Sequence, residues 1–142
     1  MIIRECDGQS VPAVFRSEGA ALGFIRERIA PGSIVHADEA SSWDALHVRF
    51  DMKRINHQQA YSADGACTNM AKEYFSRFRR GEIGHHHHIS SVYLLRYAQE
   101  ASWREDHRWE MNGAQYERIA EAAMKRGSSV DFCGYWQRHN KD

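Results

Sequence analysis

The sequence predicts a mixed α/β fold in which a small sheet precedes a C-terminal layer of helices. Two observations support this prediction. Short segments of strand-forming residues occur in the first half of the chain, at 1–4, 11–15, 33–37 and 52–56. Apolar residues recur at helical spacing in the second half, over 68–80, 90–105 and 113–126. The chain has 142 residues, of which 42% are apolar, so it can bury the core of one domain.

The first two strands flank a turn at Asp7-Gly8, a pair that is typical of hairpins. A helix follows from Ser17, and the breaker pair Pro31-Gly32 ends it. Its apolar residues recur at helical spacing: Ala21, Leu22, Ile25 and Ile29.

The middle of the chain alternates strands with a helix. The apolar strand 33–37 finishes on Asp38-Glu39, a helix covers 41–48, and a weaker strand covers 52–56. Strands that alternate with a helix are typical of an α/β sheet.

Three helices make the C-terminal part of the predicted fold. The helix 68–80, drawn on a wheel of about 100° per residue, has an apolar side. That side consists of Ala71, Tyr74, Phe75 and Phe78. The helix 90–105 has Ser90 or Ser91 as its N-cap. The helix 113–126 has an apolar stripe made by Tyr116, Ile119, Ala120, Ala123 and Met124.

Charge and cysteine content restrict the class of protein. The chain has 19 basic and 19 acidic residues, so binding to nucleic acid or to a membrane surface would need a local patch. No apolar run is long enough to span a bilayer, and the N-terminus lacks a signal-peptide pattern. The cysteines Cys6, Cys67 and Cys133 are widely spaced and odd in number, which argues against a disulfide framework and favours a reducing cytoplasm.

Two carboxylates follow the strand 33–37. Asp38 and Glu39 stand just past the C-terminal end of this strand, where open α/β sheets place active sites. The alternative is that Asp38 caps the next helix. Spacing alone leaves both interpretations open.

The helix 68–80 has a polar side opposite its apolar side. Asn69 and Glu73 lie one turn apart on it, and Arg77 and Arg80 continue it. A functional surface would have this composition. An ordinary solvated face with a Glu73–Arg77 ion pair would also have it, and from spacing alone that interpretation is favoured.

Four consecutive histidines, His85 to His88, are internal to the chain and are therefore not a terminal tag. Consecutive side chains cannot all point at one ion, so at most two could share a metal site. They precede the helix 90–105, whose N-terminus could help them, with Arg79 and Arg80, to meet phosphates. The alternative is that they simply pack and cap.

Asn56 and His57 end the strand 52–56, close in sequence to the helix 68–80. Either side chain could orient a phosphate or a water molecule, and a structural turn explains them equally well.

Several segments, taken in order, carry a resemblance to one family. They are HADEASSWDAL, KRINH, GACTN, SRFRRGEIGHHHHIS, YLLRYAQEASWRED and GYWQRH. The chain resembles the catalytic domain of bacterial insertion-sequence transposases of the DDE type, in the branch that carries a zinc ribbon before an RNase-H-like core. The resemblance runs from Ile2 to His139 and implies a truncated RNase-H-like (integrase-like) sheet with C-terminal helices.

The resemblance implies DNA transposition by metal-dependent DNA cleavage and strand transfer. In this chemistry carboxylates hold two divalent ions, Mg²⁺ or Mn²⁺, which activate water and a DNA 3′-hydroxyl. Asp38 matches the second catalytic Asp of the family, and Asn69 matches the Asn of its T-N pair. The basic run after that pair suits phosphate contacts, and the histidine run lies near the substrate. The predicted DNA contacts are Arg77, Arg79, Arg80, His86 and His87.

The chain departs from the family pattern at the third acidic residue. The family usually reads T-N-x-A-E here, which places the acid at Lys72. Glu73 is the neighbouring carboxylate, and a shift of one residue rotates it by about 100°. Both side chains flank the polar side, so Glu73 is the candidate third catalytic residue and, with Asp38, a metal ligand. A lysine beside a dication is unfavourable, so we expect little activity from the chain alone.

A second departure concerns the first catalytic Asp and the zinc ribbon. Both are expected upstream of the Met1 strand, Asp7 is a poor substitute, and the chain has no Cys-x-x-Cys pair. We therefore expect residues 1–142 to form a single partial transposase catalytic domain. The alternatives are a non-catalytic DNA-binding fragment that modulates a full-length transposase, and a pseudogene relic. The expected partners are DNA, at the element ends and target, and a second copy or a full-length transposase. The expected location is the cytoplasm, in association with the nucleoid.

Overall fold

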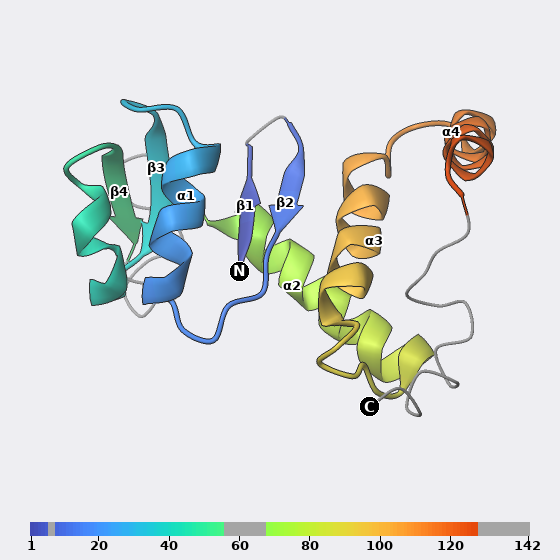
Figure 1. The fold of residues 1–142 in the computed structure, drawn as a ribbon, viewed down its shortest axis with the longest axis horizontal. Coiled ribbons are helices and arrows are strands. Elements are labelled where there is room, and N and C mark those ends of the chain that lie inside the picture. Colours follow the sequence, from blue (N-terminus) through green and yellow to red (C-terminus); the bar gives the residue numbers. More distant parts are fainter. Residues whose placement is uncertain (6–7, 56–67, 128–142) are drawn as a thin grey trace. The chain divides into compact units, whose positions relative to one another are not determined.

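Residues 1–5, 8–55 and 68–127 are described by a computed structural model of the chain (Figure 1). The chain divides into two compact units, Met1–Asp106 and His107–Asp142. Several sequence predictions fall outside the described residues: the first position of the Asp7-Gly8 turn, the pair Asn56 and His57, and the aromatic tail beyond residue 127.

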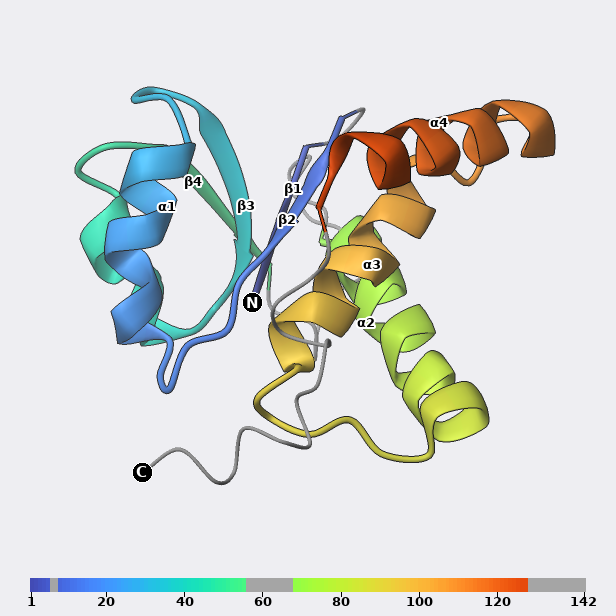
Figure 2. The same cartoon turned by 45° about the vertical axis from the view of Figure 1, so that its right-hand side comes forward.

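The first unit is a mixed α/β structure, which confirms the predicted class and is compatible with a truncated RNase-H-like fold. Its strands are β1 (Ile2–Arg4), β2 (Ser10–Pro12), β3 (Ile34–Asp38) and β4 (Asp51–Ile55). Its helices are α1 (Leu22–Arg28), α2 (Asn69–Gly81) and α3 (Leu94–Asp106) (Figures 1 and 2). Short 3-10 helices cover Gly19–Ala21, just before α1, and Ser41–Leu46, between β3 and β4.

The described strands form two separate two-stranded sheets. β1 and β2 form an antiparallel hairpin, as the sequence predicts, and Ile3 is opposite Val11 in it. The second strand is shorter than the predicted 11–15, because β2 ends at Pro12. β3 and β4 run parallel, and their register places Asp38 opposite Ile55. The C-terminal ends of β3 and β4 therefore meet, and Asp38 is the last residue of its strand rather than the first residue after it.

One apolar cluster connects α1 with residues of both sheets. Its buried residues are Ala21, Ile25, Leu46 and Phe50. Side chains from β1, β3 and β4 pack against it, among them Ile3, Val35 and Met52. The removal of these side chains from water is the main favourable term for folding of this part. The predicted helix breaker is also confirmed, because α1 ends before Gly32, which has a φ of 80° that favours glycine.

The helices α2 and α3 pack against each other, and α3 also contacts β2 (Figure 2). Tyr74 is buried between the helices, and its hydroxyl donates a hydrogen bond to the carbonyl oxygen of Ala98 at 2.7 Å. Asp106 accepts hydrogen bonds from the backbone N–H of Ser10 at 2.9 Å and from its hydroxyl at 2.6 Å. These bonds tie the end of α3 to the start of β2.

Three predictions about helices need correction. The helix predicted over 41–48 is a 3-10 helix that ends at Leu46, with i to i+3 bonds such as His47 N–H to Asp44 O at 3.3 Å. The helix predicted from Ser90 begins at Leu94, because Tyr93 N–H bonds to Ser90 O at 2.9 Å in a preceding turn. The predicted serine N-cap is therefore wrong.

The third correction concerns the histidine run. α2 continues directly into a π-helical turn over Glu82–His86, so His85 and His86 end a helix instead of preceding one. α3 begins six positions after His88. The prediction that the histidine run leads directly into the next helix is therefore wrong, although His86 contacts Tyr97 in the first turn of α3.

The second unit contains α4 (Asn112–Lys125), close to the predicted range 113–126. Glu110 and Arg118 form an ion pair at 2.8 Å within this unit. No residue of α4 is buried, and the side chains predicted to form its apolar stripe include Tyr116, Ile119 and Met124, which are exposed. The helix prediction is confirmed.

A membrane-spanning helix was not expected from the sequence. Within the described part of the chain, every helix is too short or too polar to cross a bilayer.

Candidate nucleic-acid interface

Asp38 lies at the C-terminal end of the parallel strand pair, as the last residue of β3. The side chain is exposed, and its Oδ1 accepts a hydrogen bond from Trp43 Nε1 at 2.8 Å. The next helical turn has Ala40 at its N-cap position, without a side-chain cap. Asp38 therefore anchors Trp43 and does not cap that helix.

The polar side of α2 is solvent-exposed, as the helical wheel predicts. Tyr74 is buried on the opposite side, where it stacks on Phe78 with ring centroids 6.0 Å apart. The exposed side chains of α2 are Asn69, Lys72, Glu73, Ser76, Arg77, Arg79 and Arg80. All of the α2 residues that the sequence analysis assigned to catalysis or DNA contact therefore lie on the solvent-exposed side.

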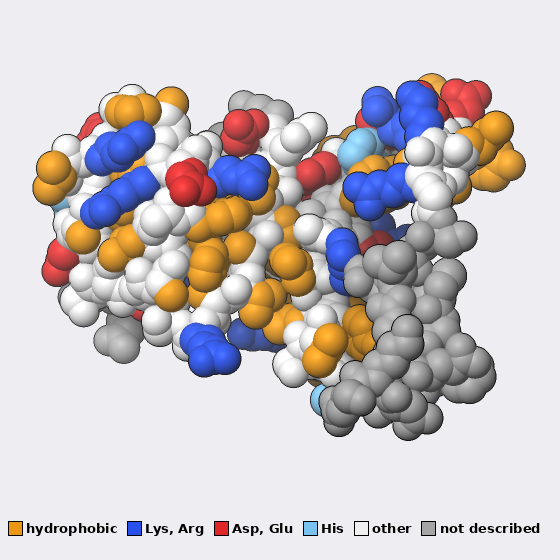
Figure 3. Space-filling view, viewed as in Figure 1, with side chains coloured by type: hydrophobic (Ala, Val, Ile, Leu, Met, Phe, Trp, Pro, Cys, Tyr) orange, Lys and Arg blue, Asp and Glu red, His pale blue; other side chains and the backbone are white. Residues whose placement is uncertain are grey.

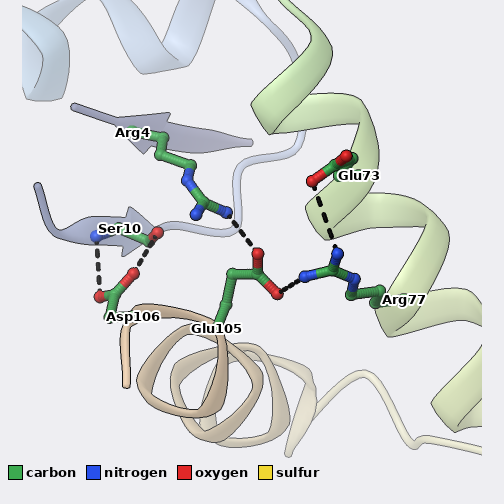
Figure 4. A network of polar contacts seen from close by, with 6 residues as sticks. All are labelled: Arg4, Ser10, Glu73, Arg77, Glu105 and Asp106. Carbon is green, nitrogen blue, oxygen red and sulfur yellow. Dashed lines mark hydrogen bonds and ion pairs between the residues drawn. The ribbon is translucent and has the colours of Figure 1, made fainter. Parts of the chain in front are cut away.

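Arg77 lies between two carboxylates (Figure 4). Its Nη2 is 3.5 Å from Glu73 Oε2, one helical turn away, which confirms the ion pair that the spacing suggested. Its Nη1 donates a hydrogen bond to Glu105 Oε2 on α3. The Glu105 side chain is only 5% exposed, whereas that of Arg77 is 40% exposed. Arg77 thus connects the exposed side of α2 to a buried acid.

Glu105 has a second cationic partner, Arg4 of β1, at 3.1 Å. The Arg4 side chain is 8% exposed, so this ion pair is almost fully buried. The chain of contacts Arg4–Glu105–Arg77–Glu73 therefore joins β1, α3 and α2 (Figure 4). No local pattern in the sequence identifies Glu105, although an arginine directly after the apolar residues Met1, Ile2 and Ile3 indicates that an internal partner is needed.

The other basic residues of α2 have different surroundings from Arg77. Among the residues that the structure describes, no carboxylate lies within ion-pair distance of Lys72, Arg79 or Arg80. Arg80 makes one internal contact, from its Nε to the carbonyl oxygen of Ser76 at 3.4 Å.

The four histidines form an exposed turn at the end of the α2 helix. The His86 ring contacts the Tyr97 ring of α3, with centroids 4.6 Å apart. His87 has a φ of 57°, and His88 N–H donates to His86 O at 2.6 Å across it. This tight reversal stops the helix, and a cationic histidine there would complement the negative end of the helix dipole.

The predicted metal ligands Asp38 and Glu73 both contact other side chains. Within residues 1–5, 8–55 and 68–127, no group of three His, Cys, Asp or Glu side chains could hold a metal ion. Asp38 is bonded to Trp43, and Glu73 is paired with Arg77 beside the cationic Lys72. The described residues therefore do not fit a complete two-metal centre.

A mixed α/β unit that carries an exposed basic helix suits a protein that acts on nucleic acid, and comparison with known families identifies the class. The sequence model of the ISXO2-like transposase domain matches residues 1–106. The chain belongs to this family of insertion-sequence transposases, which confirms the resemblance to an insertion-sequence transposase over residues 1–106 and implies interaction with DNA. The matched range is the same as the first compact unit. No curated protein and no solved structure matches the chain.

Proposed function

We propose that the chain takes part in DNA transposition, through metal-dependent DNA cleavage and strand transfer at the ends of an insertion sequence. The observation that carries this proposal is the family match over the whole unit that presents the exposed polar side of α2. The reaction chemistry and the roles of Asp38 and Asn69 come from the family resemblance, and the exposure and contacts of each residue come from the structure.

Asp38 is the carboxylate best suited to a hard cation such as Mg²⁺ or Mn²⁺, because it is exposed and only its Oδ1 is bonded to Trp43. Glu73 is a weaker candidate, since one of its oxygens pairs with Arg77. Asn69 lies one turn from Glu73 and would help to orient the DNA. Because the described residues supply no three-ligand group, we derive no catalytic step from them.

The DNA would contact the basic residues of α2 and the turn that follows it. Arg79 and Arg80 are exposed near the end of α2, and His86 and His87 are exposed at the end of the same continuous helix. Cationic and hydrogen-bonding side chains of this kind hold phosphates and fix the position of a duplex without reading its sequence.

A second function is favoured by the residue at position 72. Lysine stands where the family pattern leads us to expect the acid, and Glu73 next to it is held by Arg77. These two features suit a non-catalytic fragment that binds DNA, or a full-length transposase, and modulates transposition.

A cleavage assay separates the two functions. The chain would be incubated with labelled element ends and Mn²⁺, alongside Asp38→Asn and the control Asp51→Asn, an exposed carboxylate at the start of the neighbouring strand. Nicking that is lost in Asp38→Asn but kept in Asp51→Asn would support the cleavage function. Binding without any nicking would support the modulating fragment, and neither binding nor nicking would contradict both.

A further inference from the structure

We propose that the DNA-facing cations of α2 are Lys72, Arg79 and Arg80, and that Arg77 is an internal ion-pair residue that makes no phosphate contact. The inference rests on the proposed action on DNA. It deepens that proposal, because it adds Lys72 to the predicted contacts and removes Arg77 from them.

Arg77 is committed to the protein itself. Its two terminal nitrogens face two different carboxylates, Glu105 and Glu73 (Figure 4). A phosphate contact would require Arg77 to leave Glu105, whose side chain is 5% exposed. Glu105 would then lose one of its two cationic partners at a site that is almost fully buried, and Glu73 would lose its ion pair, so Arg77 should keep its internal contacts when DNA binds.

Lys72, Arg79 and Arg80 are placed differently on the same helix. All three are exposed, and no described carboxylate pairs with any of them. At about 100° per residue, Lys72 lies about 20° from Arg79 and about 80° from Arg80, so the three side chains share an arc of roughly 100° on the helix surface. Their spacing of seven and eight residues spans about 10–12 Å along the axis at 1.5 Å per residue. B-DNA carries one charge per about 1.7 Å of its axis, so a stripe of this length can meet more than one phosphate.

The helix dipole does not explain these cations. Basic residues stabilise the last turn of a helix, and their effect falls off within that turn. α2 continues through the π-helical turn to His86, which is six positions beyond Arg80. Arg79 and Arg80 therefore lie before the last turn, and Lys72 lies in the first half of α2.

The charge of the whole molecule also makes local cations important. Basic and acidic residues are equal in number, and Figure 3 shows their side chains interspersed across one face. DNA binding must therefore come from a local group of cations. Lysine in place of the expected acid at position 72 changes the charge there from −1 to +1. The position thus becomes unsuited to a metal ion and suited to a phosphate.

The salt dependence of DNA binding tests the assignment residue by residue. Fluorescence anisotropy with a labelled duplex, between about 50 and 200 mM salt, gives the slope of log K against log salt concentration. Lys72→Ala, Arg79→Ala and Arg80→Ala should each reduce the steepness of this slope by about 0.9. Arg77→Ala, and the control Arg49→Ala on an exposed loop, should leave the slope unchanged.

Two results would overturn the assignment. The first is a slope that becomes shallower in Arg77→Ala and returns to the wild-type value in Arg77→Lys. Because a phosphate contact needs only a positive charge, this pair of results would show that residue 77 contacts a phosphate. The other is an unchanged slope in Lys72→Ala. If the wild-type chain shows no salt-dependent binding, the proposed function fails, and the Lys72 part fails with it.

Urea unfolding tests the Arg77 part without DNA. Lysine has one terminal nitrogen and cannot bridge Glu105 and Glu73 as the guanidinium does. Arg77→Lys and Glu105→Gln should each lower the urea midpoint. The sum of these two shifts should exceed the shift of the double variant, because both substitutions remove the same interaction. Strictly additive shifts would show that the two side chains do not interact and would overturn this part.

Discussion

Replacement of Glu105 by glutamine removes the charge that lies between Arg4 and Arg77. The Arg4 side chain is 8% exposed, so it would remain buried without its counter-charge. Breaking a buried ion pair by neutralising one partner typically costs about 3–5 kcal/mol. The Arg77 side chain is 40% exposed and can be solvated by water, so the loss of its contact with Glu105 should contribute little to the destabilisation. We therefore expect the free energy of unfolding to fall by about 3 kcal/mol, the lower end of that range.

Urea unfolding followed by circular dichroism measures this loss. For an m-value of about 1–3 kcal/mol/M, the midpoint should fall by roughly 1–3 M. The double variant Arg4→Met with Glu105→Gln should recover much of the loss, because it removes the unpaired buried cation.

A matched control is available on the same helix. Glu100 pairs with Arg104 at 2.8 Å, but the two side chains are 49% and 72% exposed. Glu100→Gln should cost no more than about 0.5 kcal/mol. If Glu105→Gln costs as little as Glu100→Gln, the argument that a buried network holds β1, α2 and α3 together is refuted.

Three further predictions concern other contacts of the first unit. Ser10→Ala removes the hydroxyl that bonds to Asp106, so it should lower the free energy of unfolding, measured in urea, by about 1–3 kcal/mol. An unchanged urea midpoint would mean that this bond does not hold α3 to β2. Gly32→Ala should lower the free energy of unfolding by about 1 kcal/mol, because the φ of 80° at this position is unfavourable for a residue with a Cβ atom. Gly23→Ala, within helix α1, should raise it by about 0.5–1 kcal/mol, because alanine favours a helix more than glycine does. Two effects of the same sign would contradict this reasoning. Burial raises the pKa of Tyr74 above its ordinary value of 10.0, so the native state holds this proton more tightly than the unfolded chain. This contribution to the free energy of unfolding is complete below pH 10 and is lost as the pH rises through the native pKa of Tyr74. Urea unfolding at a series of pH values across this range should therefore show a steeper fall of the free energy of unfolding with pH for wild type than for Tyr74→Phe. Equal slopes of the two proteins would count against the prediction.

Local patterns were enough to predict most elements of the first unit. The turn signal at Pro31-Gly32 and the apolar spacing of α1 and α2 each act over a few residues, so they can be recognised in the sequence. The wheel of α2 predicted which side chains are exposed, because the buried Tyr74 and its apolar neighbours define the opposite side. The Glu73–Arg77 pair was predictable for the same reason, since its partners are one turn apart.

Contacts between distant segments could not be predicted in this way. Glu105 pairs with Arg4, which lies at the opposite end of the first unit in sequence, and no local pattern connects them. The end of α2 was misjudged because the helix continues as a π-turn through Gly84, a residue that normally argues against a helix. The apolar stripe of α4 was a correct helix signal, but a stripe does not specify what covers it.

The roles of Asp38 and Glu73 in metal binding, and the zinc-ribbon branch of the family, stay predictions. The family match shows an insertion-sequence transposase, and no group of three described side chains could hold a metal ion. The function of this chain therefore depends first on whether the exposed side of α2 binds DNA.

The most direct test is the affinity of the intact wild-type chain for duplex DNA as a function of salt. Three phosphate contacts, from Lys72, Arg79 and Arg80, predict a log–log slope of about −2.7, since each contact contributes about −0.9. A linear plot with this slope would support the central claim that the chain acts on DNA through α2. The absence of binding at about 50 mM salt, or binding that does not change with salt, would contradict it.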